Sequence, residues 1–590
     1  MVKYFYLIIL LVIITAQLCY AEKVSSPGCS ITEIKPLYIT PGPESYKAPS
    51  FIQSGSGIRP PDMDWVNTIL ASMTLEEKLG QMIMLWYSSS SADYNVQTFK
   101  AGGFIFSVRG AASVVQAVNH LQGLTDVPLW FAADFECGTG TRIYEGTTFP
   151  MNMALGAANN EVLAASCGWV TAREAWAMGM QIGFGPVVDV NTDPENPIIS
   201  TRSYGDNPAL VSKMAQAWIG GAHVSGMLTS LKHYPGHGPT HDDSHTTMPT
   251  VTLSENELRA IHIKPYENLI NNGFSDLVMS AHVWYTALDP DPWPATLSSS
   301  AMTDVLRNDL GFTGIAISDA FNMSGLGSVL PQDEAAVVGI QNGLDIILMP
   351  SNTELTIGAL IDAVSEGRIL ESRIDESVRR ILMAKSSMWL PDYMYRDESH
   401  MWDVLSQPEH FTVAESVAEA SITKVTEETG VLPLIPDHNV LCLSLKHSKS
   451  IFVTPDYSYF SDRLGADLPN LDVYTVDLSL SESIIQQYVN MSESYDRIVV
   501  AGYNWTPLTS ESQIDLVERL SAGTVPVIYI SFGSPYHGLQ INGLENFFCA
   551  YACVDVSQWA GADVLLGKID AKGTLPISNY RMQSTYWIVY

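Results

Sequence analysis

Basic residues are scarce in this chain of 590 residues: 31 lysines and arginines stand against 63 aspartates and glutamates, a formal net charge of −32 at pH 7. A surface this acidic repels phosphate backbones and anionic lipids, so it argues against nucleic-acid and membrane-surface partners. The hydrophobic fraction of 46% is that of a globular chain and not of a disordered one. This balance suits a soluble protein that binds an uncharged ligand.

Cysteine is also rare, with seven residues in the whole chain. They are scattered, and a chain of this length can build a core without covalent staples, so no disulfide framework is predicted. The sequence lacks a Gly-x-Gly-x-x-Gly turn after a first strand, which argues against a dinucleotide-binding fold. We also find no internal repeat and no low-complexity block.

The N-terminus resembles a targeting segment. Lys3 supplies a positive charge, Leu7–Thr15 is apolar, and Cys19-Tyr20-Ala21 reads as a small-x-small cleavage site. Residues 1–21 therefore predict a signal peptide and an exported protein, secreted or held in a periplasmic or lysosome-like compartment; a retained anchor is the alternative. No later run of about 20 apolar residues occurs, so no membrane span is expected after signal removal. Residues 22–60, rich in Ser, Pro and Gly, predict an exposed leader.

Apolar runs of strand length alternate with helical patterns over residues 61–390. Continuous apolar strands separated by helices are typical of a parallel sheet that is buried on both faces. The eight runs are Gly80–Trp86, Gly102–Val108, Pro128–Ala133, Gln181–Asp189, Leu228–His233, Ser275–His282, Thr313–Ser318 and Asp345–Met349. Their number predicts a (β/α)8 TIM-type barrel, with a doubly wound open sheet as the alternative.

The ends of these runs favour the barrel. Several are followed by polar or charged clusters: Asp134-Phe135-Glu136, Asp189-Val-Asn-Thr-Asp193, Lys232-His233, Ser280-Ala-His282 and Ser318-Asp319. In a barrel the carboxyl ends of all strands open onto one mouth, so we expect these side chains to meet there.

A polar linker over 391–409 precedes a second domain over 410–590. Six further apolar runs alternate with helices and predict a smaller α/β layered domain. They are Asn439–Leu445, Leu471–Val476, Arg497–Gly502, Pro526–Phe532, Asn546–Ala552 and Thr574–Ser578.

Four histidines follow the fifth run at intervals of four residues: His233, His237, His241 and His245. On a helix this spacing would suggest a metal site. Two prolines and two glycines lie within five residues between Pro235 and Pro239, so the segment is predicted to be a loop and no metal is expected. A zinc site built from loop histidines and an ordinary polar loop remain the alternatives.

Two features of the sequence predict catalysis: the pair Asp243 and His245, and Asp319. Asp243 and His245 are two residues apart, so in an extended loop the carboxylate can point at the imidazole and fix its tautomer, as an acid/base catalyst requires. Asp319 ends the seventh apolar run, where a carboxylate meets the mouth; a cap of the next helix is the alternative. A nucleophile and a proton shuttle on opposite sides of a sugar form the arrangement of a retaining glycosidase.

The loop Lys232-His-Tyr-Pro-Gly-His-Gly-x4-Asp243-Ser-His245 resembles the signature of glycoside hydrolase family 3, and most closely its β-N-acetylglucosaminidase (β-N-acetylhexosaminidase) branch. The resemblance covers most of the chain after the leader. Other segments with counterparts in the family are Asp134-Phe-Glu136 with Gly138 and Arg142, Asp189-Val-Asn191, Arg202-Ser-Tyr-Gly205, Ser318-Asp319, Gly343-Leu-Asp345, Arg373-Ile-Asp375, Leu432-Pro-Leu434 and Gly561–Pro576.

This resemblance implies an N-terminal barrel, a C-terminal αβα sandwich and no cofactor. It implies Asp319 as nucleophile, His245 as acid/base and Asp243 as the partner of His245. It also implies a substrate with terminal β-linked N-acetylglucosamine: a chitin or peptidoglycan fragment, or a glycan. The residues implied to hold the terminal sugar are Asp134, Arg142, Arg202, Lys232 and His233.

Family members that act on glucose or xylose typically lack this loop, so its presence favours the N-acetylglucosaminidase branch. A β-glucosidase or β-xylosidase of the same family is the nearest alternative. A phosphorolytic enzyme is another, since an imidazole, unlike a carboxylate, does not repel phosphate. A carbohydrate-binding relative without activity is the alternative from another class. Cys137 departs from the family, which usually has glycine there.

Overall fold

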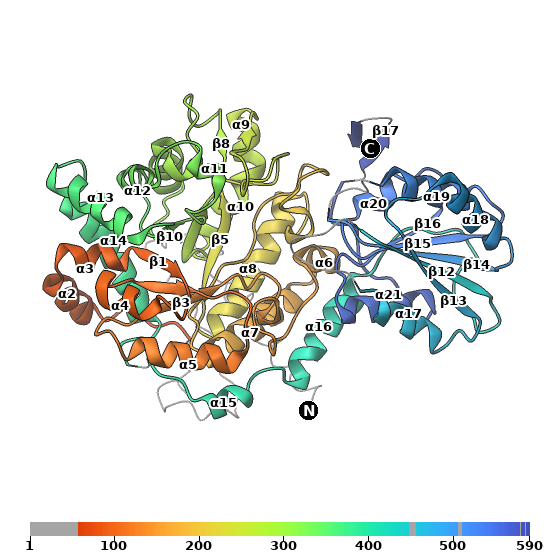
Figure 1. Cartoon of the computed structure of the whole chain (residues 1–590), viewed down its shortest axis with the longest axis horizontal. Coiled ribbons are helices and arrows are strands. Elements are labelled where there is room, and N and C mark those ends of the chain that lie inside the picture. The colour runs from red at the N-terminus through yellow and green to blue at the C-terminus, as the bar shows by residue number, and fades with distance from the viewer. Residues whose placement is uncertain are drawn as a thin grey trace, which may run out of the picture.

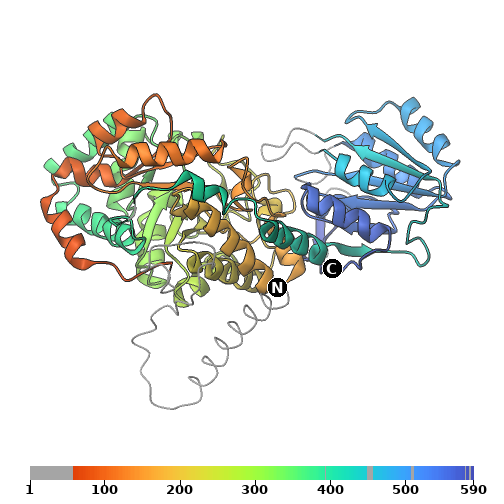
Figure 2. The same cartoon turned by 90° about the horizontal axis from the view of Figure 1, so that it is seen from below.

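The computed structural model describes residues 57–392, 394–447, 456–505, 510–578, 580–583 and 586–589. The predicted signal peptide and most of the predicted leader lie outside these residues. The chain forms two lobes that lie side by side (Figure 1). Helix α16 (Pro408–Ser421) joins them, and the turned view shows it in blue-green between the lobes (Figure 2).

The first lobe is a parallel eight-stranded sheet in the order β10-β1-β2-β3-β4-β5-β7-β9. The strands are β1 (Ile83–Trp86), β2 (Gly103–Ile105), β3 (Trp130–Ala133), β4 (Ile182–Gly183), β5 (Leu228–Tyr234), β7 (Leu277–Ser280), β9 (Ile315–Ser318) and β10 (Ile347–Leu348). A parallel bridge between Ile317 and Ile346 brings the two edges of the sheet together. The predicted (β/α)8 barrel is confirmed, and every strand coincides with a predicted apolar run.

Helices alternate with the strands and surround the barrel (Figures 1 and 2). They are α2 (Met63–Ser72), α3 (Leu75–Gln81), α4 (Ala92–Phe99), α5 (Ala111–Gln122), α6 (Asn152–Ala158), α7 (Glu161–Ala177), α8 (Pro208–Val224), α10 (Lys264–Asn271), α12 (Gln332–Gln341), α13 (Thr353–Ser365), α14 (Glu371–Ser387) and the π-helical η6 (Ser300–Asp309). Local sequence explains their starts: Thr74 and Glu77 form a capping box at α3, and Asn207 caps α8 ahead of Pro208.

One barrel strand is much shorter than its apolar run. β4 covers only Ile182 and Gly183 of the run that extends to Asp189. The rest of the run lies along β5 as irregular chain, where Val188 N donates to Lys232 O at 2.9 Å. This path carries Asp189 to the end of β5.

The second lobe contains a six-stranded sheet in the order β11-β16-β15-β14-β12-β13. Its strands are β11 (Thr423–Thr426), β12 (Val440–Leu445), β13 (Leu471–Val476), β14 (Arg497–Gly502), β15 (Val527–Ser531) and β16 (Asn546–Cys549). All pair in parallel except β11, which is antiparallel to β16. Helices α17 (Ser458–Gly465) and α21 (Asp555–Leu565) lie on one face, and α18 (Glu482–Ser492) and α19 (Glu511–Ser521) on the other (Figure 1). The predicted αβα sandwich is confirmed.

One predicted strand of this lobe is wrong. Thr574–Ser578 forms no strand, and β11 takes the sixth place in the sheet. The segment bonds to the barrel lobe instead: Thr574 N donates to Ala157 O at 2.9 Å, and Pro576 O accepts from Asp206 N at 3.2 Å. Because Pro576 has no N–H to donate to a ladder, the segment suits this contact between lobes better than a strand inside a sheet.

The predicted linker over 391–409 contains a short helix, α15 (Glu398–Trp402). The amide of Asn119 anchors it to the barrel through the backbone N and O of Arg396, at 2.7 and 2.8 Å. α16 starts at Pro408 and packs against α6 and α7 of the barrel and against α21. No helix in the described part of the chain is both long and apolar enough to cross a membrane.

Candidate active site

The mouth of the barrel holds a chain of alternating charges. Lys232, near the end of β5, places its Nζ 2.9 Å from Asp134 Oδ1 and 2.7 Å from Glu136 Oε1. Arg142 Nη2 lies 3.3 Å from the other oxygen of Asp134. Both carboxylates follow β3, so the ends of β3 and β5, the strands on either side of β4, meet here, as the strand-end clusters predict. Asp134, Arg142 and Lys232 thus form one contiguous group.

Glu136 continues this chain to Arg202. Its two oxygens accept from Arg202 Nε and Nη2, both at 2.8 Å, the two-pronged geometry that suits a guanidinium and a carboxylate. The side chains of Lys232 and Arg202 are only 2% and 6% exposed, so their charges are shielded from water. Burial raises the pKa of Glu136, but Arg202 and Lys232 outweigh it and hold this pKa well below its usual range. The network is therefore ionised at neutral pH.

His233 is held by a buried carboxylate. Asp189 Oδ2 lies 2.8 Å from His233 Nδ1, and Asp189 Oδ1 accepts the backbone N–H of His237 at 2.6 Å. Asp189 is fully buried; burial raises its pKa, but His233 and His237 lower it, and the net direction is down. The carboxylate thus orients Nδ1–H of His233 toward itself and leaves Nε2 toward Arg202, at 3.4 Å.

Asp319 stands at the end of β9. Its backbone N donates to Ser280 O at 3.0 Å, and its Oδ1 accepts from Ala320 N at 2.7 Å. Burial raises the pKa of Asp319, but His233, His282, the Ala320 N–H and Lys232 lower it, and the net shift is downward. Asp319 is not a helix cap, because the next helix, α11 (Ser324–Gly327), has Met323 as its N-cap. It is an ionised carboxylate at the mouth.

The histidine-rich segment is a loop, as predicted. It leaves β5, passes close to the chain after β4, and returns to the strand pair β6 (Thr250–Val251) and β8 (Trp284–Tyr285). Gly238 permits the close passage, since a Cβ at this position would lie 1.7 Å from Val190 O. The loop is therefore anchored at β5 and at the segment that follows β7.

The middle of the loop carries the Asp243–His245 pair. Asp243 Oδ1 lies 2.7 Å from His245 Nδ1 and accepts the His245 backbone N–H at 2.8 Å. The two side chains are 31% and 51% exposed. The loop also touches the chain after Asp319: Ser324 N donates to His245 O at 3.3 Å, and a Cβ at Gly325 would lie 2.6 Å from Ser244 O. The pair thus lies on a loop whose backbone bonds the segment that follows Asp319.

The four histidines do not converge on one point. His233 pairs with Asp189, His237 bonds Thr240 and Ser244, His241 pairs with Asp193, and His245 pairs with Asp243. Among the residues that the structure describes, no group of three or more His, Cys, Asp or Glu side chains is arranged to hold a metal ion.

Three residues of the site were not predicted individually: Glu136, Asp189 and His282. His282 is buried, and its Nε2 lies 3.1 Å from Ala320 O, beside Asp319. All three belong to polar clusters at the ends of apolar runs, so the signal was present in the sequence. The sequence did not indicate which residues these three side chains pair with.

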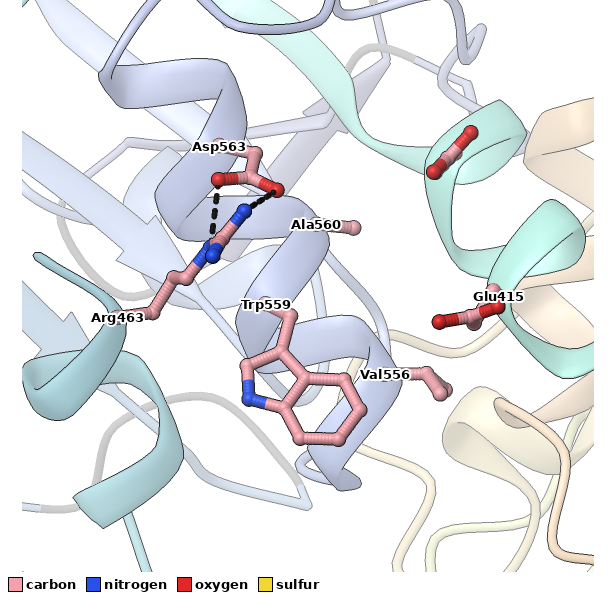
Figure 3. A pocket seen from close by; sticks show the side chains of 7 residues that line it. Glu415, Arg463, Val556, Trp559, Ala560 and Asp563 are labelled. Atoms are coloured by element: carbon pink, nitrogen blue, oxygen red, sulfur yellow. Dashed lines mark hydrogen bonds and ion pairs between the residues drawn. The ribbon is translucent and has the colours of Figure 1, made fainter. Parts of the chain in front are cut away.

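A separate hollow of about 210 Å³ lies in the second lobe (Figure 3). It lies where α16, α17 and α21 meet, and Arg463 pairs there with both oxygens of Asp563 at 2.8 and 2.9 Å. Trp559 and Glu415 line it as well (Figure 3). None of its lining residues belongs to the mouth of the barrel, so this hollow is not part of the candidate active site.

A barrel mouth with an ionised carboxylate, a carboxylate–imidazole pair and a cluster of charged groups fits a glycoside hydrolase. Residues 74–384 match the family model described as the N-terminal domain of glycosyl hydrolase family 3. Because this match covers more than half of the chain, the protein belongs to glycoside hydrolase family 3, and the predicted membership is confirmed.

Relatives extend the likeness into the second lobe. The chain is 28% identical over 552 residues to a β-N-acetylglucosaminidase/β-glucosidase of Cellulomonas fimi, covering 88% of this chain and 96% of that protein. It is 27% identical over 543 residues to β-hexosaminidase A of Pseudoalteromonas piscicida, covering 82% and 90%. The solved family 3 β-N-acetylglucosaminidase of Paenibacillus sp. str. FPU-7 superimposes with a TM-score of 0.79 at 30% identity, covering 86% and 99%. A solved β-glucoside phosphorylase gives a TM-score of 0.78 at 25% identity, covering 88% and 96%.

Proposed function

We propose that this enzyme is a retaining exo-glycosidase that removes terminal β-linked N-acetylglucosamine, or a related N-acetylhexosamine, from chitin or peptidoglycan fragments or from glycans. The observation that carries the proposal is the Asp243–His245 pair, 2.7 Å apart, on a loop whose backbone bonds the segment after Asp319. The names of the two sequence relatives and of the Paenibacillus structure support the choice of sugar.

In the first half of the reaction, Asp319 attacks the anomeric carbon and a covalent glycosyl-enzyme forms. The bond from that carbon to the leaving oxygen breaks, and His245 transfers its Nε2 proton to this oxygen. Asp243, bound to Nδ1, holds the ring in the orientation that presents Nε2 and stabilises the imidazolium before transfer. The downward shift of the pKa of Asp319 keeps the nucleophile ionised.

In the second half, His245 takes a proton from a water molecule. The resulting oxygen attacks the anomeric carbon, the bond to Asp319 breaks, and the sugar leaves with its original configuration. The exposure of the imidazole matters here, because the same nitrogen must meet both the leaving group and the water. His245 is half exposed, which gives it this access.

The charged and polar groups at the mouth of the barrel hold the terminal sugar. We assign Asp134, Arg142, Arg202, Lys232 and His233 to its hydroxyls. Their own partners within the network keep these donors and acceptors in place. Such a site rejects an analogue that lacks a hydroxyl, because a buried charged group is then left without its partner.

Specificity for glucosides, and phosphate instead of water as acceptor, are the second candidate. One sequence relative carries β-glucosidase in its name, and one solved neighbour is a β-glucoside phosphorylase. An imidazole acid/base group without negative charge does not repel an incoming phosphate. The loop argues for the amino sugar, because family members that act on glucose typically lack it.

A panel of aryl β-glycosides tests the proposal. We expect kcat/KM for p-nitrophenyl β-N-acetylglucosaminide to exceed that for the glucoside and the xyloside by roughly tenfold or more. Each assay is run with and without inorganic phosphate, and sugar and sugar 1-phosphate are separated as products. A preference for glucoside or xyloside contradicts the sugar assignment, and phosphate-dependent sugar 1-phosphate contradicts hydrolysis. Cleavage of none of them, with binding of chitobiose, indicates an inactive relative.

A further inference from the structure

Glu174 is a buried carboxylate that bonds the loop after β3. Glu174 belongs to α7 and has no exposed surface. It accepts from Thr147 N at 2.9 Å and from Thr147 Oγ1 at 2.7 Å, and Thr139 Oγ1 also donates to it. Thr139 and Thr147 lie at the two ends of the loop after β3, the loop that carries Arg142. Glu174 therefore clamps this loop at both ends.

The loop itself is compact between the two threonines. Gly140 N donates to Thr147 O at 2.9 Å, and Arg142 N donates to Thr139 O at 3.0 Å. The backbone of Arg142 is thus one bond away from a residue that Glu174 holds. Movement of either threonine changes where the Arg142 guanidinium lies relative to Asp134.

Glu174 also reaches the connection between the lobes. It accepts from Ser406 N at 3.1 Å and from His410 Nδ1 at 2.7 Å. Ser406 lies in the predicted linker, and Ser406 Oγ donates to Glu145 O of the same loop. His410 belongs to α16 and is fully buried, with its ring edge-on to Trp169. One carboxylate thus joins the sugar-site loop to the segment that leads into the second lobe.

These contacts use the whole acceptor capacity of Glu174. A carboxylate has about four acceptor positions, and five donors point at this one. Burial raises the pKa of Glu174, but the bonds from His410 and Thr139 lower it, with a net downward shift. The group is therefore ionised, fully bonded within the protein and out of reach of a sugar, so it acts only through the residues that it holds.

We propose that Glu174 is a positioning residue that sets Arg142 against the substrate, and that it makes this placement depend on the docking of α16 through His410. The inference rests on the proposed function, because it takes Arg142 to bind the terminal sugar. It adds a connection through which the second lobe supports sugar binding without touching the sugar.

A double-mutant cycle of Glu174→Gln and Arg142→Ala tests the inference. Glu174→Gln places an amide N–H₂ among donors, so the loop shifts, and we expect KM to rise about tenfold with a smaller change in kcat. In the Arg142→Ala background the same change should leave KM almost unaltered, because the group that Glu174 positions is gone. An equal rise in KM in both backgrounds, or no rise in either, overturns the inference.

Asp276→Asn is the matched control. Asp276 precedes β7 at the opposite end of the barrel and accepts from the same donor types: His223 Nε2 at 2.7 Å, Thr229 N at 2.9 Å and Thr229 Oγ1 at 2.8 Å. This variant should lower the unfolding temperature as Glu174→Gln does, but leave KM unchanged. A comparable rise in KM would mean that any loosening of the barrel has this effect, and would overturn the inference.

Two milder variants complete the test. Thr147→Val removes one hydroxyl donor to Glu174 and keeps the backbone bond, so it can replace Glu174→Gln if that variant does not fold. We expect Thr147→Val to raise KM severalfold when Arg142 is present and to leave KM almost unaltered in the Arg142→Ala background. His410→Phe removes the donor that α16 supplies and keeps a ring against Trp169. An unchanged KM would overturn the part played by α16.

Failure of this inference is distinguishable from failure of the proposed function. The cycle uses whichever aryl glycoside the wild-type enzyme cleaves, so a different sugar specificity leaves the test intact. If Arg142→Ala alone does not change KM, the inference falls while the hydrolysis of N-acetylglucosaminides still stands on the substrate panel.

Discussion

The two parts of the active site differ in how their charges are surrounded. In the inner network, Lys232 and Arg202 are buried, the side chains of Glu136 and Asp134 are 14% and 28% exposed, and each charge has at least one partner within 3 Å. The outer pair of Asp243 and His245 has one contact between its side chains and is 31% and 51% exposed. The paired charges of the inner network are held in place by their partners, whereas the Asp243–His245 pair is accessible to water and to an incoming group.

This difference matches two different tasks. A group that holds hydroxyls must keep its charge and place throughout the reaction, which paired, buried charges do well. A group that gives up a proton and takes another must exchange with its surroundings, which a fully enclosed imidazole cannot do. Asp319 belongs with the inner network, since His233, His282, the Ala320 N–H and Lys232 outweigh the effect of burial and lower its pKa.

The largest effect should come from Asp319→Asn, which replaces the proposed nucleophile with an amide of the same size. We expect kcat to fall by about 10⁴-fold or more, because no covalent intermediate can form. Steady-state kinetics on p-nitrophenyl β-N-acetylglucosaminide measure it, with the unfolding temperature as control for the fold. Retention of wild-type activity would show that another group forms the bond to the sugar.

His245→Ala tests the outer pair. Loss of the proton donor should cost on the order of 10²–10⁴-fold in kcat/KM on chitobiose, whose leaving oxygen needs a proton. An activated dinitrophenyl glycoside, whose leaving group departs without a proton, should lose far less in the same measurement. Equal losses on the two substrates would mean that His245 does not protonate the leaving oxygen.

Glu136→Gln and Asp243→Asn compare the two parts directly in stability. Glu136→Gln leaves Arg202 and Lys232 with a neutral partner inside the barrel, and we expect a loss of about 3 kcal/mol in the free energy of unfolding. Asp243→Asn changes a half-exposed pair and should alter this free energy by less than about 1 kcal/mol while lowering activity. Thermal or urea unfolding of both variants measures the contrast; equal losses of stability would remove the distinction between the two parts.

Glu136→Gln also tests how the stability of the fold depends on pH. Because the folded pKa of Glu136 lies well below its usual range, its stabilising contribution is present above the unfolded pKa, near 4.3. It is lost as the pH falls through the lower folded pKa. The unfolding temperature of the wild type should therefore decrease below about pH 4, and Glu136→Gln should make this decrease shallower.

Most of the fold could be predicted because the strands of a parallel barrel are buried on both faces and appear as continuous apolar runs. β11 was missed for the complementary reason. Thr423–Thr426 is an edge strand with alternating exposure, and its sequence contains no apolar run. Thr574–Ser578 was mistaken for a strand because its apolar residues are buried between the lobes, a contact that leaves no periodic pattern.

The candidate site was predictable in its residue types but not in its pairing. The loop with Asp243 and His245 stands out because its carboxylate and imidazole are two residues apart, so the contact is local. Glu136 and Arg202 are 66 residues apart, and Lys232 and Asp134 are 98 apart. No pattern in the chain indicates which of the strand-end charges meet.

The amino-acid sequence by itself determined the eight strands of the barrel, the loop at the end of β5 and the local contact of Asp243 with His245, because each depends on neighbours along the chain. Only the tertiary structure decided that Glu136 pairs with Arg202 and Lys232, that Asp189 pairs with His233, and that Glu174 ties the loop of Arg142 to the linker. Those contacts depend on how the barrel closes and where α16 docks, and both are set by packing between segments far apart in the chain.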